Sequence, residues 1–269
     1  MDLVVFGDSW TYGDELVPDT PEYRNKVNIG GLVYRDYNFE NYHNYSANGG
    51  SLQHIIVHIL KYLNSSNYST DNLILVGLTT PLRKLRFSNI AKKPLNWASH
   101  KYEQYITHCD DSLKESDIFK LWWESEVYCN VNVRNDLIYY FNSINTIKSL
   151  LSEHSKYIVW QSIDGGLYDK VETDFEEIIS DYENQNSKDT DHEFFDLFFN
   201  KTFVKNQISK NTKDSQLWIN FDELSWRDWI FSQNDDKMFI EGRNHPSEYG
   251  ISEWYSKILK KYIDKILDN

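Results

Sequence analysis

Short, continuous apolar runs ended by turn residues are the feature that most constrains the fold of this chain. The first run is Leu3–Phe6, which stops at Gly7, and the clearest later run is Leu73–Leu78, which Pro81 follows. A strand with one face in water alternates apolar and polar residues, whereas a strand that is apolar throughout is buried on both faces. These runs therefore predict strands of a parallel sheet that is covered on both sides.

The remaining elements alternate in type along the chain. Further strands are predicted at residues 39–45, 157–160 and 217–219, which makes five in all. Apolar residues recur at a helical period in residues 51–63, 135–151 and 252–267. Alternating strands and helices predict an α/β fold with a parallel, doubly wound sheet and helices on both faces.

The length of 269 residues fits one large domain. Two long polar stretches, at about residues 88–133 and 165–215, exceed what a minimal sheet needs and are predicted to be partly helical insertions. No internal repeat or linker is evident, so residues 1–269 are interpreted as a single domain with two insertions.

Composition excludes several classes of function. Acids outnumber bases by 41 to 28, which gives a net charge of −13 and disfavours binding to nucleic acid. The basic run at Arg83, Lys84 and Arg86 is interpreted as a solvated helix face. Cys109 and Cys129 fit neither a disulfide framework nor a zinc site and are expected to be free thiols. The chain shows no secretion signal and no membrane span, so we expect a cytoplasmic protein without a membrane partner.

The first run leads directly into a chemically suggestive turn, Gly7-Asp8-Ser9. Ligands of open parallel sheets bind beyond the carboxyl ends of the strands, which is where this turn is predicted to lie. Ser9 is a candidate nucleophile. The structural alternative is that Asp8 or Ser9 only caps the following helix.

A serine nucleophile needs a base, and His245 is the candidate among eight histidines. It lies in the loop sequence Asn244-His245-Pro246-Ser247, just before the last amphipathic segment. Ser247 is a candidate helix cap. The structural alternative is a histidine that only accompanies this cap.

Together these two blocks resemble the SGNH, or GDSL, hydrolase family. Gly7-Asp8-Ser9 follows the first strand and His245-Pro246-Ser247 precedes the last helix, so the resemblance spans nearly the whole chain. The short block Phe6-Gly7-Asp8-Ser9-Trp10 is most similar to divergent members found in large tailed bacteriophages. The resemblance implies a flavodoxin-like three-layer α/β/α sandwich and a serine nucleophile, with no cofactor and no metal.

The middle blocks of the family match less closely. The resemblance assigns the backbone N–H of Gly49, or alternatively Gly50, to the oxyanion hole. The family's third block carries an Asn donor that this chain lacks. Thr80 or Thr79 is the candidate replacement, because a hydroxyl can donate, and Arg83 could add charge. Asp8 is included among the substrate-binding candidates.

The family's usual Asp three residues before the histidine is also missing, since position 242 is Gly. Glu241 and Asn244 are the nearest candidates to orient the His245 imidazole, and a backbone carbonyl is a further one. The acids Asp8, Asp14 and Glu15 gather near the first turn; they could bind magnesium, but solvated acids at a helix start are the ordinary interpretation.

These observations predict a serine esterase that removes a small, acetyl-like acyl group from a polar, carbohydrate-like ester. The alternative is a catalytically weak protein of the same fold that binds carbohydrate or serves as a virion component, because fold does not imply function. If the chain is phage-encoded, the host cytoplasm or the virion is the expected location. A nucleotide-binding domain is disfavoured, because the chain has no glycine-rich phosphate motif.

Overall fold

The structure is a computed structural model that describes residues 1–80, 83–88, 93–98, 133–154, 156–163, 225–243 and 245–268. Cys109, Cys129, Asn244 and the strand predicted at 217–219 lie outside these residues, as do most of the two predicted insertions.

The centre of the fold is a parallel sheet of four strands. They are β1 (Leu3–Phe6), β2 (Tyr42–Asn44), β3 (Leu73–Leu78) and β6 (Tyr157–Gln161), in the spatial order β2-β1-β3-β6. All three pairings are parallel. This order corresponds to the first four strands of the flavodoxin-like arrangement. In that arrangement the order in which strands are added to the sheet reverses between β1 and β3, which is the topological switch point.

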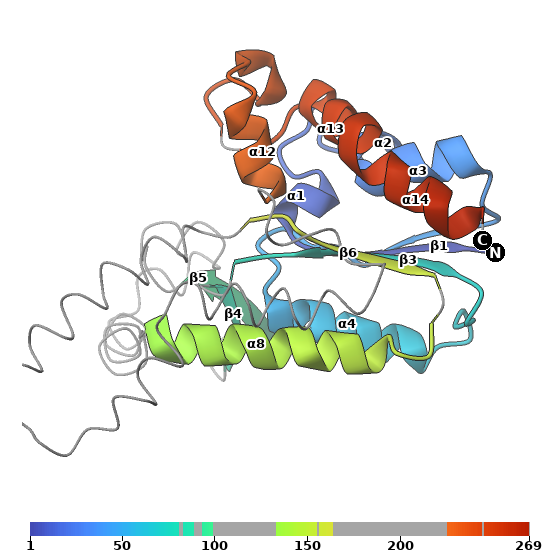
Figure 1. Cartoon of the computed structure of the whole chain (residues 1–269). Helices are drawn as coiled ribbons and strands as arrows, with labels where there is room; N and C mark the ends of the chain where they lie inside the picture. The colour runs from blue at the N-terminus through green and yellow to red at the C-terminus, as the bar shows by residue number, and fades with distance from the viewer. Residues whose placement is uncertain are drawn as a thin grey trace, which may run out of the picture.

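Helices cover both faces of the sheet (Figure 1). On one face lie α4 (Leu52–Leu63) and α8 (Val133–Leu150). On the other face lie α1 (Ser9–Tyr12), α2 (Pro21–Val27), α3 (Ile29–Tyr37), α12 (Trp226–Ser232), α13 (Glu248–Trp254) and α14 (Lys260–Leu267). A 3₁₀ turn, η1 (Asp236–Met238), and a π-helical turn, η2 (Tyr255–Leu259), complete this layer. The expected three-layer α/β/α sandwich is therefore confirmed.

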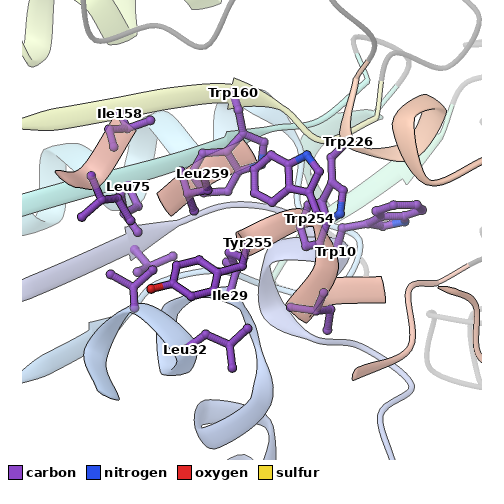
Figure 2. Close-up of a cluster of buried hydrophobic side chains, with 14 of the residues drawn as sticks. Trp10, Ile29, Leu32, Leu75, Ile158, Trp160, Trp226, Trp254, Tyr255 and Leu259 are labelled. Carbon is purple, nitrogen blue, oxygen red and sulfur yellow. The ribbon is translucent and has the colours of Figure 1, made fainter. Parts of the chain in front are cut away.

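Two hydrophobic cores explain why the strands are apolar at every position. Val4 and Phe6 of β1 belong to the core beneath α4 and α8, whereas Leu3 and Val5 belong to the opposite core. The second core contains a cluster of buried tryptophans, shown in Figure 2: Trp10, Trp160, Trp226 and Trp254. Successive side chains of a strand point to opposite faces, so each strand supplies both cores.

A polar network fastens the N-terminal helix α3 to the C-terminal helices. Asp36 accepts hydrogen bonds from the Tyr255 hydroxyl at 2.8 Å and from Lys260 Nζ at 3.2 Å, and the Tyr37 hydroxyl contacts the Asp264 carboxylate. Although burial works against it, these hydrogen bonds hold the pKa of Asp36 below its ordinary value. The network keeps residues from the two ends of the chain side by side.

The sequence interpretation was wrong for the basic run. Arg83–Ser88 forms a strand, β4, which pairs antiparallel with β5 (Lys93–Ala98) in a separate two-stranded sheet. β4 thus precedes the first predicted insertion, and β5 lies within it. Among the described residues, no helix is long and apolar enough to cross a membrane.

Candidate active site

The carboxyl ends of the parallel strands carry the polar residues that the sequence singled out. Ser9 follows β1, Thr79 follows β3, and the loop Ala47–Gly50 follows β2. The Ala47 N–H donates to the Gly7 carbonyl at 3.1 Å, and a Cβ on Gly50 would lie 3.3 Å from the Asp8 Cα. The loops after β1 and β2 thus meet beside the crevice where ligands of such sheets bind.

Asp8, and not Ser9, caps helix α1. Asp8 Oδ1 accepts hydrogen bonds from the Trp10 N–H at 3.2 Å and from the Thr11 N–H at 3.3 Å. The cap satisfies two N–H groups that the first turn of any helix leaves open. This assigns Asp8 a structural role, and it leaves the Ser9 hydroxyl without a capping function. The substrate contact expected of Asp8 stays a prediction.

The Ser9 hydroxyl lies beside a cation. Ser9 is 1% exposed, and its Oγ is 3.5 Å from Nη1 of Arg83, the first residue of β4. The same Nη1 lies 3.4 Å from the Thr79 hydroxyl and 3.8 Å from Asp8 Oδ2. The hydroxyls after β1 and β3 are therefore linked through one guanidinium.

The Asp8 carboxyl is fully buried, and its electrostatics follow from that burial. Burial raises the pKa of Asp8, although the charge of Arg83, the Thr11 amide, the Thr79 hydroxyl and the charge of His245 act in the opposite direction. An effect of His245 on Asp8 means that residues from the two ends of the chain share one electrostatic environment.

A tight loop holds His245 at this place. The Ile240 N–H donates to the His245 carbonyl at 3.0 Å, and the Ser247 N–H donates to the Met238 carbonyl at 2.8 Å. Ser247 caps α13 through the Gly250 N–H at 3.1 Å, which confirms the predicted cap. The backbone on both sides of His245 is thereby fixed before the helix begins.

The imidazole of His245 is held by a carboxylate from the other end of the chain. Its Nδ1 is 2.9 Å from Oε2 of Glu15, and Oε1 of Glu15 accepts a hydrogen bond from Arg243 Nη1 at 2.8 Å. The His245 ring also lies 6.4 Å, between centroids, from the ring of Trp10. Ser9 is the residue before Trp10, so the loop that carries His245 lies close to the turn that carries Ser9.

The other ring nitrogen of His245 is the one a base would use. Nε2 is buried and, within the part of the chain that the structure describes, has no hydrogen-bond partner; it makes an ion-pair contact with Asp14 Oδ2 at 3.9 Å. Among the described residues, no hydrogen bond joins Nε2 to the Ser9 hydroxyl, whose contact is Arg83. Hydrogen bonds between catalytic groups are often long before substrate binds.

Glu15 takes the place that the sequence suggested for Glu241. Glu241 is exposed, and the carboxylate on Nδ1 is that of Glu15. Sequence reasoning noticed the acids at residues 14 and 15 but assigned them to solvent, because 230 positions separate Glu15 from His245. One signal was present: Gly13 ends α1 in the left-handed conformation, so the chain turns sharply just before these acids.

The two glycines proposed for the oxyanion hole differ in what their N–H groups do. The Gly50 N–H donates to the Ala47 carbonyl at 3.1 Å and is therefore occupied. Within the described residues, the N–H groups of Gly49 and Ser9 donate to no acceptor. The geometry favours Gly49 over Gly50. A hydrogen bond from the Arg83 N–H to the Thr80 carbonyl, 3.2 Å long, holds the loop after β3.

A second layer supports Thr79. Gln161, at the end of β6, donates from Nε2 to the Thr79 carbonyl at 3.2 Å and to the Ile163 carbonyl at 2.6 Å. Its Oε1 contacts the Tyr140 hydroxyl of α8. No group of three or more His, Cys, Asp or Glu side chains that could hold a metal ion occurs among the residues the structure describes.

Two solved structures are similar to this chain, both with low identity. One is a member of the lipolytic protein G-D-S-L family from Veillonella parvula DSM 2008, with 14% identity, a TM-score of 0.45 and coverage of 97% of each chain. The other is phospholipase A1 from Streptomyces albidoflavus NA297, with 11% identity, a TM-score of 0.45 and coverage of 97% of this chain and 98% of that one. No protein-family model and no curated protein matches the sequence.

Proposed function

We propose that the protein is a serine ester hydrolase with Ser9 as the nucleophile, His245 as the base and Glu15 as the residue that orients His245. The observation that carries the proposal is the contact of Glu15 with His245 Nδ1 at 2.9 Å, six residues from Ser9 in the chain. A carboxylate on Nδ1 selects the tautomer whose Nε2 can accept a proton, and here Nε2 is buried with no hydrogen-bond partner among the described residues.

The proposed reaction proceeds in two steps. Ser9 Oγ attacks the ester carbonyl carbon while its proton passes to His245 Nε2, and the alcohol then leaves with that proton. Water next attacks the acyl-Ser9 ester, gives its proton to His245, and the carboxylic acid is released as Ser9 recovers its hydrogen. Glu15 stabilises the imidazolium that forms in each step.

The N–H groups of Ser9 and Gly49 are the proposed donors to the oxyanion. Both belong to the loops that meet at the carboxyl edge, and neither has an acceptor within the described part of the chain. Arg83 adds a positive charge 3.5 Å from the nucleophilic oxygen. Preorganised donors of this kind lower the barrier because they already point to where negative charge develops.

The near-complete burial of Ser9 favours a small acyl group over a long one. We therefore propose an acetyl-like group on a polar alcohol, with a carbohydrate ester as one such substrate. A role in a bacteriophage and a cytoplasmic location remain predictions that rest on the sequence.

One observation favours a second candidate, a protein of this fold that binds a ligand without turnover. The Ser9 hydroxyl contacts Arg83 and not His245, which is what a site that has lost catalysis would also show. The experiment below separates the two candidates.

The test is labelling with a fluorophosphonate probe together with hydrolysis of p-nitrophenyl acetate. We expect Ser9 to be labelled and both signals to disappear in Ser9→Ala. Ser162→Ala is the matched control, because Ser162 is also buried at the carboxyl edge, and it should keep both signals. Unchanged hydrolysis in Ser9→Ala, with no label on Ser9, would exclude the enzyme and leave the binding protein.

A further inference from the structure

The guanidinium of Arg83 is incompletely paired for a side chain so close to the nucleophile. Its contacts within the described residues all involve Nη1: Ser9 Oγ at 3.5 Å, Thr79 Oγ1 at 3.4 Å and Asp8 Oδ2 at 3.8 Å. Charge-assisted hydrogen bonds of arginine are normally about 2.7–2.9 Å long and are often bidentate. These three contacts are longer, and in the described part of the chain Nε and Nη2 donate to no group.

Asp8 does not satisfy this cation. Its Oδ1 accepts from the N–H groups of Trp10 and Thr11, and no hydrogen bond to its Oδ2 is found among the described residues, where Arg83 Nη1 lies 3.8 Å away. Burial also raises the pKa of Asp8, which weakens it as a counter-ion. The positive charge of Arg83 therefore acts on whatever approaches Ser9.

Arg83 is also placed to meet a ligand. Its side chain is 21% exposed, whereas Ser9 is 1% exposed, so Arg83 is the part of this pair that solvent reaches. The whole chain carries a net charge of −13, so its general field repels anions. At Arg83 the local charge is positive, in contrast to the net negative charge of the chain.

We propose that Arg83 binds an anionic group on the alcohol part of the ester, so that the substrate is an acylated hydroxy acid or a similar anionic alcohol. The inference rests on the proposed function. It assigns the anion to the alcohol side because the proposed acyl group is small and uncharged. Arginine suits this role, since its fork of N–H donors matches a carboxylate.

The test compares two acetyl esters, 3-acetoxybenzoate and its methyl ester, in which the negative carboxylate of the first is replaced by a neutral methyl ester. Wild type should show a higher kcat/KM for the anionic ester relative to the neutral one. Arg83→Ala should reduce that ratio about 10- to 100-fold, the loss typical of a hydrogen bond to a charged group, and Arg83→Lys should reduce it less. Added salt should lower the ratio in wild type and not in Arg83→Ala.

The matched control is Arg35→Ala, which removes an exposed arginine of α3 and should leave the ratio unchanged. An equal loss on both esters in Arg83→Ala would overturn the inference and leave Arg83 with only the role proposed above, a positive charge beside the Ser9 oxygen. Circular dichroism verifies folding; if Arg83→Ala does not fold, Arg83→Gln and Arg83→Lys supply the same comparison.

A binding measurement separates failure of this inference from failure of the proposed function. Calorimetric titration of the Ser9→Ala variant with 3-hydroxybenzoate and with its methyl ester needs no turnover. Tighter binding of the anion that disappears when Arg83→Ala is added supports the site even if neither ester is hydrolysed. Equal binding of the two compounds would refute it, whatever the esterase assay shows.

Discussion

Replacing Glu15 by Gln tests the least expected part of the site. The change keeps the size of the side chain and can keep a hydrogen bond to Arg243 or His245, but it removes the negative charge 2.9 Å from Nδ1. Glutamine can also turn its NH₂ group toward Nδ1. The ring proton then moves to Nε2, and the base loses the lone pair that it needs.

The size of the effect follows from these two losses. A hydrogen bond to a charged group contributes about 1.5–3 kcal/mol, which corresponds to about 10- to 150-fold in rate. Selection of the wrong tautomer in a serine-protease triad lowers kcat by about 10⁴-fold. We therefore expect kcat/KM of Glu15→Gln to fall about 100-fold, and as far as about 10⁴-fold if the wrong tautomer dominates.

The assay is steady-state hydrolysis of p-nitrophenyl acetate by wild type, Glu15→Gln and Glu241→Gln. Ser9→Ala gives the background rate. Glu241 is exposed, so its variant should stay within about twofold of wild type, as surface changes usually do. The reverse pattern, with Glu241→Gln inactive and Glu15→Gln fully active, would refute the assignment of Glu15 and restore the interpretation from sequence.

Three further predictions concern the same region and its support. Glu15 has a φ of 64°, so Glu15→Gly should relieve about 1 kcal/mol of backbone strain; its melting temperature should not fall, although its activity should, and a large loss of stability would contradict this. Burial, together with the neighbouring His58 charge, lowers the pKa of His54 from 6.5 to about 4, so the unfolded state binds more protons between these values and stability decreases as the pH falls. Urea unfolding should show that the free energy of unfolding falls between pH 7.5 and pH 5.0 by at most about 2 kcal/mol, or about 1 kcal/mol once solvent screening is included. His54→Gln should remove most of this decrease, and an equal decrease in the variant would assign it to other groups. A Cβ on Gly77 would lie 2.2 Å from Thr11 Oγ1, so Gly77→Ala should cost about 2 kcal/mol by thermal unfolding, and adding Thr11→Ala should restore part of it; no effect of the single change would mean that α1 can shift freely.

Two of the apolar strands and the turn Gly7-Asp8-Ser9 were predictable because local pattern determines them. The runs Leu3–Phe6 and Leu73–Leu78 were predicted at the bounds that the structure has, since strands buried on both faces show no competing period. The helix at residues 51–63 was also correct, with Ser51 as its N-cap. Helices α2 and α3 were missed, although Thr20 before Pro21 is a start signal in the sequence.

What the sequence did not predict depends on contacts between distant residues. Within β4, Lys84–Phe87 alternates charged with apolar residues, which suits a strand, but the charges were interpreted as a helix face. The sequence also could not decide between Gly49 and Gly50 as the candidate N–H donor to the oxyanion. The hydrogen bonds of these two N–H groups depend on the fold of their loop. The carboxylate partner of His245 could not be found by searching near position 245.

The 230 positions between Glu15 and His245 have a consequence for how the molecule acquires its chemistry. During synthesis on a ribosome, the hydroxyl and its carboxylate emerge first, and the imidazole arrives only after nearly all of the sheet has been made. Under the proposed function, a partly synthesised chain therefore has no esterase activity. In the finished protein, loosening of the last helices should abolish turnover while the sheet is still intact, so enzymatic activity should report damage earlier than any spectroscopic signal of unfolding.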